Sequence, residues 1–144
     1  MLKTLLTKVF GDRHEREARK LLPLVADINE VAEELRSLSD EELKAQTAKF
    51  REQIRERTAE LEAEIEELRQ EKRSTEDAAE REAITGRLRE AEDALKAELQ
   101  RTLDDLLPEA FATVKETCRR LVGTQITVTG QALTWDMVPY DVQL

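Results

Sequence analysis

The sequence is poor in the residues that build turns, disulfides and metal sites. Aromatic residues make up only 3% of its 144 positions, and it has four glycines, three prolines, one cysteine and one histidine. So few chain breakers argue against a turn-rich β-sandwich and against a flexible linker. One cysteine, Cys118, and one histidine, His14, exclude a disulfide framework and a structural zinc site within one chain. We expect no metal site, and interpret Cys118 as a small core residue in a reducing compartment and His14 as a surface residue.

Long hydrophobic runs are also missing, whereas charge is abundant. Charged residues make up 38% of the chain, with a formal net charge of −9. No apolar run reaches the roughly 18 residues that a membrane-spanning helix needs. Residues 1–22 carry six basic and three acidic side chains, and the rest of the chain is acidic. Only the N-terminal end would therefore attract an anionic surface, and we expect no sequence-specific nucleic-acid binding.

The first ten residues have the pattern of a short amphipathic helix. Apolar residues recur at helical spacing, with cations between them, and Gly11 follows as a stop signal. Because an isolated helix this short is marginal, something must bury its apolar face. The alternatives are an anionic membrane or partner groove, and docking on the protein itself. The candidate membrane- or partner-binding residues are Leu2, Lys3, Leu5, Leu6, Lys8, Val9, Phe10, Arg13 and Arg16.

The remaining sequence predicts a mainly α fold. A helix over about 13–36 would be bent or divided by Pro23. Ser39 and Glu42 form a capping box, which predicts a helix start with Leu38 and Leu43 as a hydrophobic staple. Two apolar series then flank a polar gap at 73–77, which favours a long antiparallel helical hairpin (a coiled coil) over one continuous helix that dimerises. The facing pairs would be Phe50 with Leu103, Ile54 with Leu99, Ile65 with Leu88, and Leu68 with Ile84.

The end of the chain predicts two further elements. Pro108 would open a last helix, with Phe111, Val114, Cys118 and Leu121 on its buried face. Alternating residues on either side of Gly130 predict a small β-hairpin over about 125–135. The predicted domains are N-terminal amphipathic and basic helices at 1–46, the hairpin at 47–106 with its tip near 73–77, and 107–144 as helix, short β-hairpin and the start of a nucleotide-binding domain.

The residues alone indicate no reaction. The four glycines are scattered and none precedes a Lys-Ser or Lys-Thr pair, so the chain holds no phosphate-binding loop. A single histidine makes a Ser-His-Asp arrangement implausible, and the many carboxylates fall on solvated helix faces. We therefore expect no catalytic residue.

Four segments, in order, resemble the N-terminal region of the SecA family, the ATP-driven motors of bacterial protein translocation. They are MLKTLLTKVFG at 1–11, LSDEEL at 38–43, LPEAFA at 107–112 and YDVQL at 140–144. The resemblance covers about 1–55 and 104–123 plus the last five residues. Residues 57–103 occupy what is usually a short connection in the family, so the hairpin is an insertion without a role to carry over.

The resemblance implies functions for the ends of the chain. Gln143 matches the family glutamine that contacts the adenine base, since an amide can donate one hydrogen bond and accept another. The cofactor would be ATP in the full-length parent, a protein-secreting ATPase. This chain alone, lacking the phosphate loop, would neither bind ATP well nor hydrolyse it. The basic N-terminal end would contact acidic phospholipids, the SecYEG channel and the ribosome, and preproteins would be further partners of a cytoplasmic protein peripheral on the inner face of the plasma membrane. A stand-alone coiled-coil adaptor or dimerisation module, with a homodimer as partner, is the alternative.

Overall fold

The computed structural model describes the backbone of residues 13–144 and the side chains of residues 19–144. Its elements, in order, are helices α2 (Arg13–Leu35), α3 (Asp40–Ser74) and α4 (Ala78–Leu121), strands β1 (Gln125–Val128) and β2 (Gln131–Thr134), and the short 3₁₀ helix η1 (Asp141–Gln143). This confirms the mainly α fold with a small β-hairpin near the C-terminus. The predicted helix at residues 1–10 lies outside the described residues.

The chain forms two compact units. Of the described residues, one unit comprises 13–43 together with 108–144, and the other comprises 44–107. Helices α3 and α4 each contribute to both, because the division falls between Leu43 and Lys44 in α3 and between Leu107 and Pro108 in α4.

The start of α3 is set by the predicted capping box. The backbone N–H of Ser39 donates to Oε2 of Glu42 at 2.8 Å, and the N–H of Glu42 donates to Oγ of Ser39 at 3.3 Å. These bonds satisfy backbone donors that a helix start leaves unpaired. The Ser39 hydroxyl also donates to Oε2 of Glu42 at 2.7 Å, and this bond, followed by the one from the Ser39 backbone N–H, holds the pKa of the Glu42 carboxyl below its usual value.

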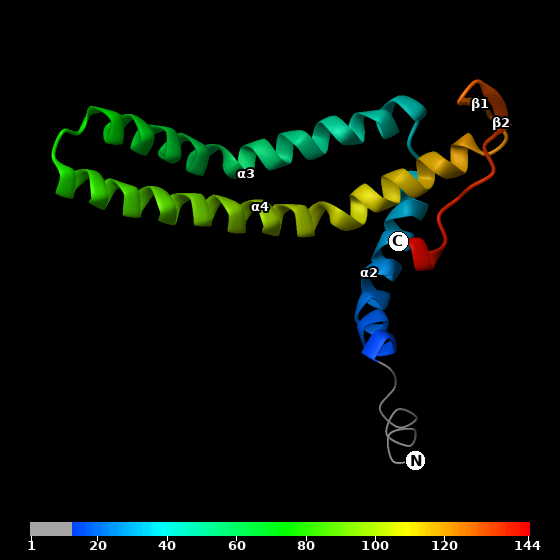
Figure 1. Ribbon diagram of the computed structural model, residues 1–144. Coiled ribbons are helices and arrows are strands. Elements are labelled where there is room, and N and C mark those ends of the chain that lie inside the picture. Colours follow the sequence, from blue (N-terminus) through cyan, green and yellow to red (C-terminus); the bar gives the residue numbers. More distant parts are fainter. Residues whose placement is uncertain (1–12) are drawn as a thin grey trace, which may run out of the picture. The chain divides into compact units, whose positions relative to one another are not determined.

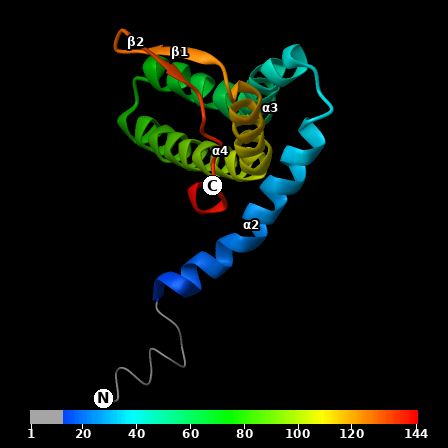
Figure 2. The same cartoon turned by 90° about the vertical axis from the view of Figure 1, so that its right-hand side faces the viewer.

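The unit of residues 44–107 is the predicted antiparallel hairpin. Helices α3 and α4 run side by side in opposite directions, joined by the short loop at 75–77 (Figures 1 and 2). Asp77 begins α4 by accepting from the backbone N–H groups of Ala79 (2.9 Å) and Glu80 (2.8 Å). The polar gap is therefore a turn, as predicted, and not the middle of a continuous helix.

The hydrophobic seam of the hairpin is shifted from the predicted register. Its apolar core consists of Ile65, Leu68, Ile84 and Ala91, with Leu88 and Leu95 packed against it. Further from the tip, Leu99 and Leu103 are 37% and 43% exposed, whereas Thr102 is fully buried. The predicted pairs Ile54 with Leu99 and Phe50 with Leu103 are therefore wrong.

The reason for the shift is a strict heptad spacing. Less exposed positions alternate by three and four residues on both helices, at 54, 58, 61, 65, 68 and 72 on α3 and at 84, 88, 91, 95, 98 and 102 on α4. This is the spacing that keeps one stripe of each helix facing its neighbour. The sequence places threonine and glutamate, not leucine, on part of that stripe. Ion pairs at its borders join Arg57 with Asp105, Arg69 with Glu92, and Arg87 with Glu71.

Two prolines lie inside helices. Pro23 does not divide α2, and Pro108 does not begin a helix, because α4 continues through it. A proline in a helix interior removes one hydrogen bond and costs ~3 kcal/mol or more, so the contacts of the flanking segments must outweigh that loss. The predicted helix start at Pro108 is wrong.

The buried face of α4 beyond Pro108 also differs from the prediction. Phe111, Val114 and Leu121 are 39%, 57% and 38% exposed, while Ala112 and Glu116 are buried. Cys118 is buried as a free thiol, as predicted. Lys115, Glu116 and Arg119 of this segment line the candidate site.

The β-hairpin has the predicted location. Strands β1 and β2 pair antiparallel, with Ile126 opposite Leu133. The two-residue turn between them has positive φ at both Thr129 (50°) and Gly130 (82°). Such a turn matches the natural twist of paired strands, and glycine adopts this backbone conformation without steric cost.

Candidate functional site

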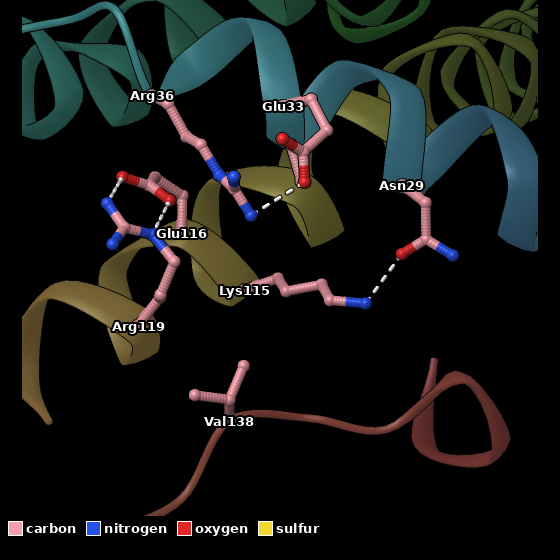
Figure 3. A pocket seen from close by; sticks show the side chains of 8 residues that line it. Asn29, Glu33, Arg36, Lys115, Glu116, Arg119 and Val138 are labelled. Carbon is pink, nitrogen blue, oxygen red and sulfur yellow. Dashed lines mark hydrogen bonds and ion pairs between the residues drawn. The ribbon is translucent and has the colours of Figure 1, made fainter.

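The unit formed by 1–43 and 108–144 contains a small cavity of about 110 Å³ between α2, α4 and the segment before η1. Figure 3 shows the labelled side chains of α2 and α4 on facing sides of the cavity. Val138 lies below them, on the segment before η1. The lining residues are Asn29, Ala32, Glu33, Arg36, Lys115, Glu116, Arg119 and Val138. The cavity is lined mostly by charged and amide side chains.

Three polar side chains at one edge of this cavity join three separate parts of the chain. Nζ of Lys115 on α4 donates to Oδ1 of Asn29 on α2 at 2.5 Å and lies 3.3 Å from Oδ1 of Asp141 on η1. Nδ2 of Asn29 donates to the same Asp141 oxygen at 3.1 Å. We call Asn29, Lys115 and Asp141 the anchor triad. The hydrogen bond from Asn29, and then that from Lys115, hold the pKa of the Asp141 carboxyl below its usual value.

The anchor triad ties η1, and with it Gln143, to the two helices. Within η1 the backbone N–H of Tyr140 donates to Oε1 of Gln143 at 2.9 Å, and the N–H of Gln143 donates to the Tyr140 carbonyl at 2.8 Å. Gln143 is exposed. Its Oε1 is thus partly engaged by its own turn, while the two Nε2 hydrogens form no hydrogen bond within residues 19–144.

A second network closes the other side of the cavity. Glu116 is 1% exposed and accepts hydrogen bonds from Nε and Nη2 of Arg119 at 2.6 and 2.8 Å and from Nε of Arg120 at 2.7 Å. These bonds, that of Arg119 foremost, lower the pKa of Glu116 to about 2 although burial opposes the charge. Glu116 is therefore a buried anion that Arg119 and Arg120 stabilise.

Arg120 extends this network to the end of α2. Its Nη2 donates to the carbonyls of Leu35 (3.1 Å) and Leu38 (2.7 Å), and its Nη1 pairs with Asp40 at 2.7 Å. The carbonyls at a helix C-terminus have no partner inside the helix, and a cation also suits the negative end of its dipole. Arg120 thus fixes the turn between α2 and α3.

The chemistry of this site is that of a scaffold. Its carboxylates and cations are paired with one another, and within residues 19–144 no group of three metal-ligating side chains is placed to hold an ion. The arrangement can hold a chain segment in position.

The sequence-predicted site residues lie in two different parts of the chain. Gln143 is in η1, next to the anchor triad. Leu2, Lys3, Leu5, Leu6, Lys8, Val9 and Phe10 lie outside the described residues, and Arg13 and Arg16 belong to α2, where only the backbone is described.

Sequence reasoning missed the anchor triad entirely. Asn29 and Asp141 are 112 positions apart, and although Asp141 belongs to the YDVQL segment, no local pattern pairs it with Asn29. The one signal in the sequence that points to Asp141 is its position two residues before Gln143.

The fold and site together define a helical scaffold that carries a long helical hairpin and presents a short C-terminal segment. Residues 6–144 match the family model described as the SecA DEAD-like domain. Relatives named protein translocase subunit SecA are 41% identical in Prosthecochloris aestuarii, over 100% of this chain, and 42% identical in Salinibacter ruber and in Chloroherpeton thalassium, each over 96% of it. The chain belongs to the SecA family.

The similarity is confined to a small part of those relatives. The chain spans 14% of the length of the first two and 13% of the third. No solved structure matches the chain. None of the helices that the structure describes combines the length and apolarity needed to cross a membrane.

Proposed function

We propose that this chain is the N-terminal part of an ATP-driven preprotein translocase motor, and that it contributes one contact to the adenine base and one to the membrane or channel. The proposed domains are N-terminal amphipathic and basic helices at 1–46, a coiled-coil hairpin at 47–106, and the start of a nucleotide-binding domain at 107–144. ATP would be the cofactor of the longer protein.

The observation that carries the nucleotide contact is the anchoring of η1. Gln143 is exposed on a turn that Asp141 ties to both Asn29 and Lys115. The Nε2 group of Gln143 can donate to an adenine ring nitrogen, and the second lone pair of its Oε1 can accept from the exocyclic amine. Anchoring lowers the entropy cost of holding an amide in place for a ligand.

Hydrolysis is assigned to the rest of the protein. Phosphoryl transfer needs a loop of backbone N–H groups and a lysine around the phosphates, and no such pattern occurs within the 144 residues. A chimera tests this division. The chain replaces its matching portion in the Prosthecochloris aestuarii protein, and we expect the chimera, but not the chain alone, to hydrolyse ATP. Turnover by the isolated chain, or an inactive but folded chimera, would contradict the assignment.

The second proposed contact is made by the cationic amphipathic end. By family resemblance its targets are acidic phospholipids, the SecYEG channel and the ribosome, with the protein cytoplasmic and peripheral on the inner face of the plasma membrane. Lys3 and Lys8 would supply the electrostatic attraction, and the apolar residues between them would enter the interface.

Flotation with vesicles tests the lipid contact. We expect the chain to bind vesicles that contain anionic lipid at low salt, and to be released as salt rises toward about 0.5 M because charges are then screened. The double variant Lys3→Glu with Lys8→Glu should stay unbound. The control, Arg51→Glu with Lys96→Glu, changes the same net charge on the exposed hairpin and should bind as the unmodified chain does. Equal binding by all three proteins would rule out the electrostatic mechanism.

The alternative function is a stand-alone coiled-coil adaptor or dimerisation module. The hairpin already covers its stripe within one molecule, with Ile65, Leu68, Ile84 and Ala91 buried. That observation favours a monomer in solution. A stable dimer joined through the hairpin, seen by mass measurement, would favour the adaptor.

A further inference from the structure

The buried stripe of the hairpin changes character near its tip. On α3 the stripe follows a spacing of three and four residues, and its next position after Leu68 is Lys72. On α4 the position three residues before Ile84 is Arg81. These are positions where such a seam normally places apolar residues. The tip therefore presents two cations where packing alone would call for aliphatic side chains.

The cations gather around a groove. An open hollow of about 430 Å³ is lined by Arg69, Lys72, Arg73, Arg81 and Leu88. We call it the basic groove. Of its four cations, Arg69 is paired with Glu92 at 3.0 Å, and the other three side chains form no ion pair within the described part of the chain.

The helix ends explain only part of this cluster. Lys72 and Arg73 lie in the last turn of α3, where the helix dipole favours a cation. Arg81 lies near the start of α4, where the same dipole disfavours one.

None of the acidic residues at the tip, Glu71, Glu76, Asp77 and Glu80, lines the groove. Glu71 accepts from Arg87, and Asp77 accepts from the backbone at the start of α4. Three unpaired cations beside the apolar side chain of Leu88 are thus left for an external anion.

We propose that the basic groove docks a short acidic segment of a partner protein, with an apolar side chain of that segment over Leu88. The net negative charge of the rest of the hairpin favours a short acidic segment over a longer polyanion. Residues 44–107 carry 13 basic and 18 acidic side chains, so an extended polyanion such as RNA or a lipid surface would meet repulsion beyond the groove. A segment of a few residues would contact the cations alone. This proposal does not depend on the translocase function.

Fluorescence anisotropy with the 144-residue chain tests the proposal. The probe is a labelled peptide of about twelve residues that contains glutamate and leucine, and its counterpart has lysine in place of glutamate. We expect the acidic peptide to bind, the lysine peptide not to bind, and binding to weaken as screening by salt increases. The triple variant Lys72→Glu, Arg73→Glu, Arg81→Glu should bind the acidic peptide at least about tenfold more weakly. A tenfold change in Kd corresponds to the loss of roughly one hydrogen bond to a charged group.

A matched variant controls for net charge. Arg51→Glu, Arg89→Glu and Lys96→Glu make the same charge change at exposed positions that do not line the groove, and this variant should keep its affinity within about twofold. Circular dichroism shows whether both variants keep the helical content of the unmodified chain, and if the triple glutamate variant unfolds, the corresponding glutamine variant takes its place. The proposal is overturned if both variants lose affinity equally, if no acidic peptide binds, or if oligo-U RNA or vesicles containing phosphatidylglycerol bind the groove more tightly than the peptide.

Discussion

Glu116 holds a negative charge at a position that is 1% exposed. Its pKa is lowered from 4.5 to about 2, mainly by the hydrogen bonds from Arg119. A carboxyl group whose pKa is lower in the folded state stabilises that state above its unfolded pKa, and the contribution is lost as pH falls toward the folded pKa. Glu116 therefore contributes stability at neutral pH that disappears on acidification between about pH 4.5 and 2.

The variant Glu116→Gln tests this assignment. An amide keeps the shape of the side chain but removes its charge and one acceptor, so the variant should lose roughly 1–3 kcal/mol of unfolding free energy at pH 7. The difference from the unmodified chain should shrink as pH falls from 4.5 toward 2. Urea unfolding at a series of pH values measures both effects, and a difference that does not depend on pH would contradict the account.

Asp141 is the residue on which the placement of Gln143 depends. The variant Asp141→Ala removes the acceptor of both Asn29 and Lys115. We expect faster amide hydrogen exchange in residues 140–144 and unchanged exchange in the core of α3. The control is Asp136→Ala, a nearby exposed carboxylate outside the triad. If both variants exchange alike, the triad does not hold the segment.

At the scale of elements, the hairpin stripe carries polar residues that weaken it. Thr102 is fully buried, and its hydroxyl donates to the carbonyl of Glu98 at 2.9 Å. That carbonyl lies in the helix interior, where it already accepts a hydrogen bond from the backbone N–H one turn further along. The hydroxyl therefore adds little there, and it takes the place of apolar contact in the stripe.

The variant Thr102→Val replaces the hydroxyl with a methyl group. We expect it to raise the unfolding free energy by ~0.5–1 kcal/mol, about the value of one buried methylene group. Thr117 makes an equivalent bond to the carbonyl of Thr113 but is exposed, so Thr117→Val should change stability little. Thermal unfolding of the two variants measures the contrast, and equal effects would show that burial is not the cause.

Most elements could be predicted from the sequence because their signals are local. The capping box at Ser39, the polar gap near residue 76 and the turn at Gly130 each involve a few adjacent residues, and the structure has all three. Pro108 was misleading because its local preference for a helix start is overridden by the contacts of both flanks. The position of the stripe does not follow from hydrophobicity, because Leu99 and Leu103 are more apolar than Thr102, whereas the heptad spacing buries Thr102.

The candidate site could be predicted only in part. Gln143 is singled out by a short segment that resembles the family, and its contact with adenine stays a prediction. The anchor triad depends on contacts between α2, α4 and η1, which no local pattern encodes. The buried Glu116 was missed for a related reason, since the sequence offered an apolar stripe on the other face of α4, including Phe111 and Val114, and that stripe is exposed.

At the scale of the whole molecule, the chain covers only a small part of the length of its relatives. It spans 14% of the Prosthecochloris aestuarii protein. The apolar side chains that α4 exposes, among them Phe111 and Val114, are 39% and 57% accessible in this chain. In a longer protein such a face is a natural surface for further domains to cover.

The most direct test of the account is the base selectivity of the chimera with the Prosthecochloris aestuarii protein. Isothermal titration would compare ADP and GDP binding by the chimera and by its Gln143→Ala variant. If Gln143 contacts adenine, the variant should bind ADP about tenfold more weakly, the value of about one net hydrogen bond, while GDP binding stays the same. Unchanged discrimination between ADP and GDP in the variant would contradict the role of Gln143 and, with it, the central claim that this scaffold presents an adenine contact.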